Sequence, residues 1–411
     1  MHLSPFLFNY CHIVKRVLNL LFDIIVLQFK VPLERRMQEE KQSNSLTRQI
    51  LQSITDASLV PFLAIVTAVV LGGIIIAFVG GNPFLAYRGL IEGAFGSTKA
   101  LSETAVWATP YIFAGLAVAL GFKGGLFNIG AEGQLAVGAV TSALIGYALP
   151  EWLGFNLPAI IHLPLAIIVG MLMGALWAGI VGWLKAYTGG HEVINTIMMN
   201  YIALNTTSFL LNGVMKDRSP TNVIARTPLI ADSARMPAIF DGLRIHWGFV
   251  LALLVAFFIW WLLNKTTLGF EIRTVGLNPD AAQYAGINVK RTIIITMMLS
   301  GMLAGLAGTI EVTGLNYRHE LGFSQGYGFD AIAIALLGKS HPLGIVLAAF
   351  LFAAMRNGAT NMQFLTQLPV DLISMIQALI LLFVAADAIV RYIYRIKSKG
   401  ERVVLTRGWG G

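Results

Sequence analysis

Residues 163–184 read LPLAIIVGMLMGALWAGIVGWL and carry no charged side chain. A helix needs about 20 mostly apolar residues to cross the hydrocarbon core of a bilayer, so this stretch predicts a transmembrane helix. Similar apolar runs lie on both sides of it along the chain. Together they predict ten spans, at residues 57–80, 105–122, 126–148, 163–184, 192–212, 246–264, 292–314, 328–338, 342–356 and 370–390.

The composition agrees with a membrane protein. Of the 411 residues, 56% are hydrophobic and only 12% are charged, which is about half the charged fraction of an ordinary soluble domain. So few charges exclude a soluble enzyme, a disordered protein and a nucleic-acid binder. Basic residues that flank the spans explain the net charge of +8, and the single cysteine, Cys11, excludes a cysteine-based metal cluster. We expect no metal site, no nucleic-acid partner, and the lipid bilayer as the solvent.

Lysine and arginine predict the orientation of the spans, because cytoplasmic loops carry an excess of both. With the N-terminus inside, 20 of the 29 basic residues fall in cytoplasmic segments. This bias predicts a multi-pass membrane protein with both termini in the cytoplasm. The expected parts are a cytoplasmic segment at 37–56, a transmembrane domain at 57–390 and a cytoplasmic tail at 391–411.

Residues 1–36 form an N-terminal extension of a different kind. The apolar run from Val17 to Phe29 is interrupted by Asp23 and is too short to span a bilayer. It follows two basic residues, as in a signal peptide, but no cleavage site of small residues comes after it. We expect an interfacial helix here, or a native start at Met37.

Three segments of the chain recur in the same order. The paired segments are FNIG at 127–130 with FSQG at 323–326, PLAII at 164–168 with PLGIV at 342–346, and EVINTI at 192–197 with DLISMI at 371–376. Five helices per repeat is an odd number, so the second copy is inverted relative to the first. The predicted fold is therefore all-α, with two inverted repeats of about five helices and with broken or re-entrant helices. Inverted repeats are typical of transporters, with the pathway near the midplane.

Residues 123–134 read KGGLFNIGAEGQ and place Asn128, Glu132 and Gln134 at membrane depth. Non-helical backbone is tolerated there only beside protein or a watery cavity, and an intramembrane carboxylate is a functional hypothesis by default. These three residues are candidates for the substrate pathway. The alternative is that Glu132 pairs with a neighbouring helix and holds the bundle together.

Further polar candidates lie in the fifth and eighth spans. Asn195, Asn200 and Tyr201 cannot all share one helix face, and hydrogen bonds between helices explain them as well as substrate contact does. Asp330 occupies the repeat position that corresponds to Gln134. The tripeptide Gly338-Lys339-Ser340 lacks the first glycine of a phosphate-binding loop, so we expect no ATP site in this chain. We also find no catalytic constellation.

The loop 265–291 is longer than a plain connection needs. Asn278 and Pro279 open a short helix within it, and Gly286 ends that helix. Ala281, Ala282 and Ala285 keep one surface small, which suits docking into a groove on a partner.

Three motifs together resemble the permeases of bacterial ABC importers for ribose, other simple sugars and branched-chain amino acids. They are GLFNIGAEGQ at 125–134, RTVGLNPDAAQYAGIN at 273–288 and GYGFDAIAIALLG at 326–338. The chain is most similar to the nucleoside (simple sugar) branch, from about residue 50 to 395. The resemblance implies an ATP-driven importer subunit of the bacterial plasma (inner) membrane that moves nucleosides or a related simple sugar by alternating access.

The same resemblance implies partners. These are a second homologous permease in a heterodimer, cytoplasmic ATPase subunits that use ATP and Mg, and an extracytoplasmic substrate-binding lipoprotein. No cofactor is expected on this chain. The residues matched to ATPase coupling are Asn278, Pro279, Ala281, Ala282, Tyr284, Ala285 and Gly286. The alternative is an ion-coupled secondary transporter that uses intramembrane acids as a proton relay, although such a transporter does not need the 265–291 loop.

Overall fold

Helices make up most of the described chain. The computed structural model describes residues 59, 61–219, 222–324, 326–369, 371–385, 389–390 and 393–395. The predicted extension 1–36, the segment 37–56 and most of the tail 391–411 lie outside these residues. The chain divides into two units, Met1–Leu63 and Ala64–Gly411. The described residues of the first unit are Leu59 and 61–63, all helical, and the packing described below is that of the second unit.

Seven helices among the described residues are long and apolar enough to cross a membrane. They are Pro61–Phe78, α3 (Thr98–Lys123), α4 (Ala131–Leu153), α5 (Ala159–Thr188), α7 (Trp247–Lys265), α10 (Val289–Glu311, continued by a π-helical turn, Val312–Asn316) and α12 (Pro342–Thr366). Each corresponds to one of the ten predicted spans. The prediction of an all-α, polytopic membrane protein is confirmed.

The other three predicted spans are helical but shorter or more polar. α6 (Glu192–Asn212) has the predicted bounds, yet its asparagine, threonine and serine side chains make it less apolar than the seven spans. α13 covers Asp371–Ala385. α11 (Tyr327–Leu337) has 11 residues and is therefore about 16 Å long, roughly half of the hydrocarbon thickness. The short eighth helix that the sequence predicts is confirmed.

The helix α2 (Pro83–Phe95) was not predicted. It has 13 residues and contains the ion pair Arg88–Glu92 at 2.8 Å, so a search for long apolar runs passes over it. The residues at its start are nevertheless typical of a helix N-terminus. Asn82 caps it by accepting hydrogen bonds from the Phe84 and Leu85 backbone nitrogens at 3.0 and 3.3 Å, and Pro83 occupies its first turn.

Several predicted boundaries are wrong. The span predicted at 126–148 starts too early, because residues 124–130 form a turn whose apolar side chains look helical in sequence. α3 begins seven residues before the predicted 105, where Ser97 Oγ accepts a hydrogen bond from the Ala100 nitrogen at 3.0 Å. α12 continues ten residues beyond the predicted 356, where Asn357 and Asn361 donate hydrogen bonds to backbone carbonyls of α2 and α3.

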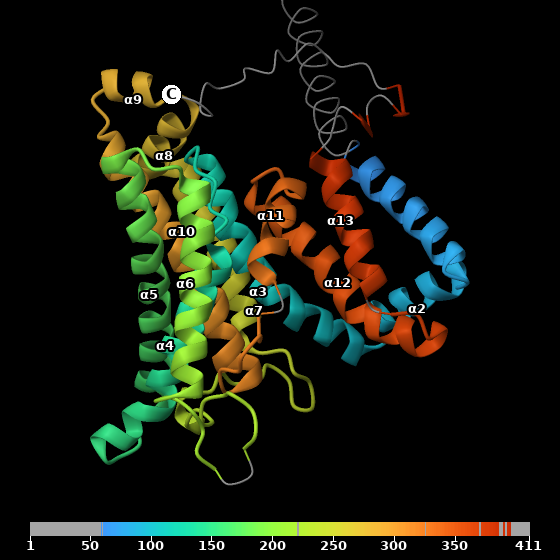
Figure 1. Ribbon diagram of the computed structural model, residues 1–411, viewed down its shortest axis with the longest axis horizontal. Helices are drawn as coiled ribbons and strands as arrows, with labels where there is room; N and C mark the ends of the chain where they lie inside the picture. The colour runs from blue at the N-terminus through green and yellow to red at the C-terminus, as the bar shows by residue number, and fades with distance from the viewer. Residues whose placement is uncertain are drawn as a thin grey trace, which may run out of the picture. The chain divides into compact units, whose positions relative to one another are not determined.

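α3 lies at the centre of the helix packing. It contacts α10, α11, α12 and α7, and most of its side chains are buried. α4, α5, α6 and α10 pack together beside it, while α2, α11 and α13 pack against α12 (Figure 1).

The two predicted repeats share one packing pattern. α5 packs on α10 as α12 packs on α3, and α4 packs on α10 as α11 packs on α3. The partners are thus exchanged between the halves, as expected when α3 corresponds to α10, α4 to α11 and α5 to α12. Close contact between α5 and α10 depends on glycine, because a Cβ on Gly305 would lie 3.0 Å from Gly174 Cα.

Candidate functional site

A glycine-rich turn at 124–130 joins α3 to α4, and Asn128 holds it together. Asn128 Oδ1 accepts hydrogen bonds from the Gly130 nitrogen and Gln134 Nε2, both at 3.0 Å. Its Nδ2 donates to Gln134 Oε1 at 2.9 Å and to Ser300 Oγ on α10 at 2.8 Å. Both amide side chains are buried. The turn is thus a break in the helical backbone that packs against other parts of the protein, as the sequence predicts.

Asn200 on α6 joins the same turn from the opposite side. Its Oδ1 accepts a hydrogen bond from the Gly133 nitrogen at 2.8 Å, and its Nδ2 donates to the Ile129 carbonyl at 2.9 Å. The amide therefore replaces bonds that a continuous helix would make internally. Asn195 is only partly buried, and Tyr201 is 61% exposed, so neither is brought to this group.

The Glu132 side chain connects the N-terminal ends of helices α4 and α11. Its Oε2 accepts a hydrogen bond from the Gly328 backbone nitrogen at 2.7 Å, and its Oε1 accepts one from the Ser324 hydroxyl. The carboxylate is buried in the first turn of α4 and next to the N-terminus of α11. Both helix dipoles favour a negative charge there. Residues 127–134 and 323–330, which are paired in the repeat, thus meet in space.

Asp330 lies apart from this hydrogen-bonded group. Its Oδ2 accepts a hydrogen bond from the Tyr111 hydroxyl on α3 at 2.7 Å and lies 3.9 Å from an Arg356 nitrogen on α12. The Arg356 guanidinium also sits over the Trp107 ring, 5.7 Å from its centroid. This is a charged and aromatic cluster built by α3, α11 and α12.

The predicted polar residues therefore fall into two sets. Asn128, Glu132, Gln134 and Asn200 are buried, and their polar atoms bond to other parts of the chain, which is the bundle-holding arrangement left open for Glu132. Asp330 remains partly exposed. A role of any of these residues in the substrate pathway stays a prediction.

Three residues of this cluster, Trp107, Tyr111 and Arg356, were not predicted from the sequence. Trp107 and Tyr111 are four residues apart, so they lie on one face of α3, and Glu103 continues that face one turn earlier. Glu103 pairs with Arg244 at 3.0 Å. The spacing of four was a usable signal, but the partners on α11 and α12 come from distant parts of the sequence.

The predicted coupling loop contains two helices, α8 (Thr267–Leu277) and α9 (Pro279–Tyr284), at one end of the helices that flank it (Figure 1). Asn278 Oδ1 caps α9 by accepting a hydrogen bond from the Ala281 nitrogen at 3.0 Å. Gly286 follows α9 with φ +83°, a conformation that favours glycine. The predicted start and end of this helix are confirmed, whereas α8 was not predicted.

One feature of the predicted docking face is wrong. Ala282 is fully buried, because it is on the side of α9 that faces the rest of the protein. Ala281 and Ala285 are exposed, and Tyr284 is 94% exposed. The surface that α9 offers to a partner is therefore made by Ala281, Tyr284 and Ala285, without Ala282.

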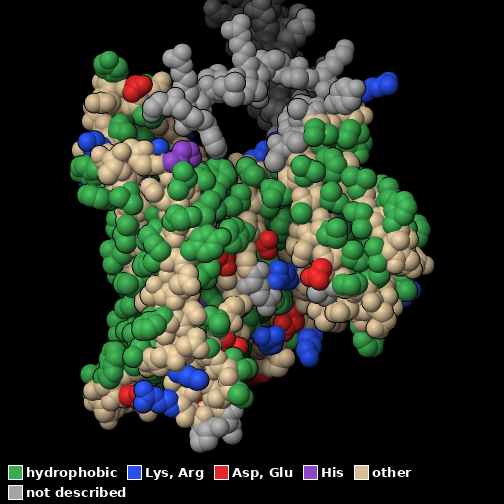
Figure 2. Space-filling model, in the orientation of Figure 1, with side chains coloured by type: hydrophobic (Ala, Val, Ile, Leu, Met, Phe, Trp, Pro, Cys, Tyr) green, Lys and Arg blue, Asp and Glu red, His purple; other side chains and the backbone are tan. Residues whose placement is uncertain are grey.

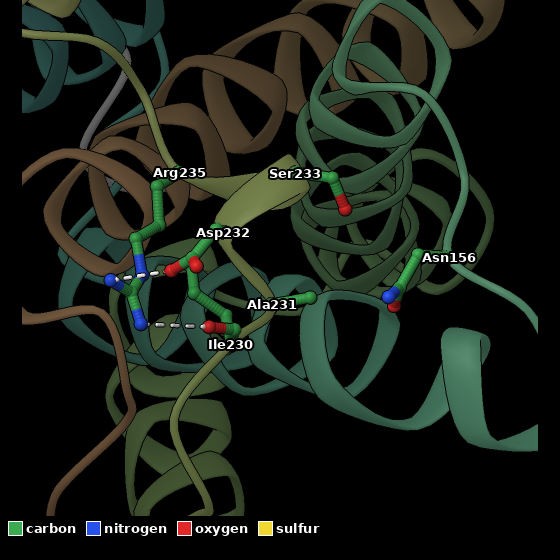
Figure 3. Close-up of a pocket in the computed structure, with 6 residues that line it drawn as sticks. All are labelled: Asn156, Ile230, Ala231, Asp232, Ser233 and Arg235. Carbon is green, nitrogen blue, oxygen red and sulfur yellow. Dashed lines mark hydrogen bonds and ion pairs between the residues drawn. The ribbon is translucent and has the colours of Figure 1, made fainter.

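A hollow lies at the end of the spans opposite to α9, between the α4–α5 turn and residues 230–235 (Figure 3). Its volume is about 420 Å³. Arg235 spans part of it by pairing with Asp232 at 2.7 Å and donating to the Ile230 carbonyl at 3.3 Å. Ser233, at its edge, bonds to His162 at 2.7 Å. None of the predicted site residues lines this hollow.

The loop before α11 contains a buried histidine whose titration gives a testable result. The backbone of His319 pairs with Thr227, and its ring lies 4.4 Å from that of Phe323. Burial lowers the pKa of His319 from 6.5 to about 3. Between pH 3 and pH 6.5, His319 binds a proton when the loop opens and exposes the ring to water, but not when the loop is closed and the ring is buried. The closed loop is therefore favoured at pH 7 and becomes less stable as the pH falls.

From pH 7 to pH 5 we expect the free energy needed to separate the His319 loop from the Thr227 loop to fall by about 2 kcal/mol. Hydrogen exchange of residues 222–231, corrected for its intrinsic pH dependence, measures this loss. His319→Gln should remove the dependence. The same pH dependence in both proteins would contradict the role of His319.

The arrangement of apolar spans, a broken helix and buried polar contacts between two repeats defines a polytopic membrane transport protein. The sequence matches the family described as "Branched-chain amino acid transport system / permease component" over residues 100–385. The chain belongs to this permease family. The resemblance to ABC-importer permeases is thereby confirmed, and the protein is a transport subunit rather than an enzyme.

Individual relatives cover most of the chain. The guanosine ABC transporter permease protein NupP of Bacillus subtilis is 42% identical over 349 residues, which are 83% of this chain and 97% of NupP. The nucleoside ABC transporter permease protein NupB of Lactococcus lactis is 36% identical over 84% of this chain and 93% of NupB. The glucose ABC transporter permease protein TsgB13 of Haloferax volcanii is 34% identical over 79% of this chain and 86% of TsgB13. No solved structure matches the chain.

Proposed function

We propose that this chain is the membrane-spanning subunit of an ATP-driven importer that moves nucleosides into the cell. The observation that carries the proposal is its similarity to the guanosine permease NupP along 97% of that protein. NupB, a nucleoside permease, supports the same substrate class. The glucose permease TsgB13 is a less similar relative, and a simple sugar is the substrate to compare in the assay.

The energy comes from partner subunits in this proposal. The chain offers α9 as a short helix outside the apolar spans, capped at its start and exposed through Tyr284. A helix of this kind fits a groove on a cytoplasmic ATPase subunit. ATP binding and hydrolysis with Mg take place in that subunit, and closure of the ATPase pair moves α9 and α8.

Movement of α8 and α9 is transmitted to the transmembrane helices because these helices pack directly against one another. α8 contacts α3, α7 and α10, and α9 contacts α10. We propose that the two repeats then shift against each other and open the pathway alternately to the outside and the inside. A second homologous permease completes a heterodimer, and an extracytoplasmic binding lipoprotein delivers the substrate. Both termini lie in the cytoplasm, as the distribution of basic residues indicates.

Tyr284→Ala tests the docking assignment. We expect substrate-stimulated ATP hydrolysis of the assembled transporter to fall about thirtyfold, because loss of a central aromatic anchor costs about 2 kcal/mol at an interface. The permease itself should fold and insert normally, since the side chain is 94% exposed. The measurement compares ATP hydrolysis by equal amounts of purified complex.

Val223→Ala provides the matched control, because Val223 is 93% exposed but lies in the loop at the other end of the spans. It should leave ATP hydrolysis unchanged. Full coupled hydrolysis in Tyr284→Ala would remove α9 from the docking surface.

A further inference from the structure

A cluster of two aromatic and two charged side chains lies where α3 meets α11 and α12. It consists of Trp107, Tyr111, Asp330 and Arg356 and is here called the Asp330 cluster. Trp107 and Tyr111 come from α3, Asp330 from α11 and Arg356 from α12. The Tyr111 ring lies edge-on to Tyr327, with centroids 5.0 Å apart, and Tyr327 in turn lies edge-on to Trp107 at 6.2 Å. Aromatic rings thus surround one carboxylate and one guanidinium.

The two charged groups are within spanning segments but remain partly accessible. The side chains of Asp330 and Arg356 are 26% and 22% exposed. Charged side chains in spans face the bundle interior or a water-filled cavity, because contact with lipid is costly. Figure 2 shows acidic and basic side chains gathered about half-way along the spans, with hydrophobic side chains on either side. At this exposure, both charged groups of the Asp330 cluster can be reached by water and by a small polar ligand.

The chemistry of this cluster fits an uncharged ligand that has both hydroxyl groups and a flat ring. Asp330 and Arg356 cancel each other's charge, so a lone cation or anion gains little. Their separation of 3.9 Å is long for a hydrogen-bonded pair. Within the described part of the chain, the contacts of the Asp330 carboxylate are made by Oδ2. This leaves Oδ1 to accept hydrogen bonds from sugar hydroxyls.

We infer that the Asp330 cluster is a selectivity site that contacts the nucleoside during its passage. Asp330 accepts hydrogen bonds from the ribose hydroxyls, held in place by the Tyr111 hydroxyl. The Arg356 guanidinium donates to oxygen acceptors on the ligand, and Trp107 offers its ring to the base. This inference rests on the proposed function, because it assigns the substrate contacts of the same transporter.

Two variants separate the contact with the sugar from the contact with the base. Asp330→Asn keeps the size of the side chain and an oxygen that accepts from Tyr111, but it removes the charge. Trp107→Leu removes the ring. Uptake of guanosine and of 2′-deoxyguanosine is measured in vesicles with the complete transporter and excess binding protein. The ratio of the two rates is compared with the wild-type ratio, so selection by the binding protein cancels.

Asp330→Asn is expected to lower the guanosine to 2′-deoxyguanosine ratio about tenfold, as for loss of one charge-assisted hydrogen bond. Trp107→Leu should slow both substrates and leave their ratio unchanged. Asp371→Asn, an exposed aspartate at the start of α13, should change neither rate. A purely structural role of Asp330 would slow both substrates equally, and that result, or an unchanged ratio, would overturn the inference. If the wild-type transporter moves no nucleoside at all, the proposed function fails together with this site.

Discussion

Gly328→Ala is expected to abolish uptake and to destabilise the folded permease by about 3 kcal/mol, at the upper end for an overpacked core. A Cβ at this position would overlap the Glu132 backbone nitrogen, and it would lie 2.5 Å from Glu132 Cα and 2.8 Å from the Ala131 carbonyl carbon. All three atoms belong to the backbone, so no side-chain rotation relieves the contact. α11 would have to move away from α4 and stretch the 2.7 Å hydrogen bond from Gly328 to Glu132.

Uptake by the reconstituted transporter and the midpoint of unfolding in detergent measure the two effects of Gly328→Ala. Gly73→Ala is the matched control, because a Cβ there would find its nearest atom, on the Tyr87 ring, at an ordinary 3.4 Å. That variant should behave as the wild type. Wild-type stability and uptake in Gly328→Ala would show that α4 and α11 do not meet in this way.

Glu132→Ala is expected to have the second largest effect. It leaves the Gly328 N–H and the Ser324 hydroxyl without their acceptor in a buried place. Each such orphaned group costs about 1–3 kcal/mol. We expect a lower unfolding midpoint and a loss of uptake of at least tenfold.

Glu132→Gln separates a contact role from a proton-carrying role. Glutamine keeps an oxygen acceptor and nearly the same shape, so stability and uptake should remain close to those of the wild type if Glu132 joins α4 to α11. An ion-coupled transporter that uses this carboxylate would instead lose uptake while it keeps its stability. That result would contradict the present account of Glu132.

Much of the fold was predictable because membrane spans depend on long apolar runs that are visible in the sequence. The bounds of α6 agree with the prediction, and the limits of α9 follow from Asn278, Pro279 and Gly286. Errors arose where local signals compete with apolarity. The turn at 124–130 is apolar enough to look helical, whereas α2 is capped like a helix but is too short and too charged to resemble a span.

The candidate site was predictable only in part. Asn128, Glu132 and Gln134 stand out because polar side chains interrupt an apolar region, and the repeat places Asp330 at a corresponding position. The partners of these residues depend on helix packing between the halves. Ser324 and Gly328 lie more than 190 residues from Glu132, and only the fold brings Arg356 to Asp330. The burial of Ala282 likewise depends on how α9 packs, which a spacing pattern does not contain.

In the proposed mechanism, partner ATPases drive import through this chain. The most direct test of this mechanism is guanosine uptake in vesicles that contain this chain with its partner permease, the ATPase subunits and the binding protein. We predict that uptake requires ATP on the side of the membrane that carries the ATPase subunits. A proton uncoupler should not affect it. Uptake that proceeds without ATP and is abolished by the uncoupler would contradict the account.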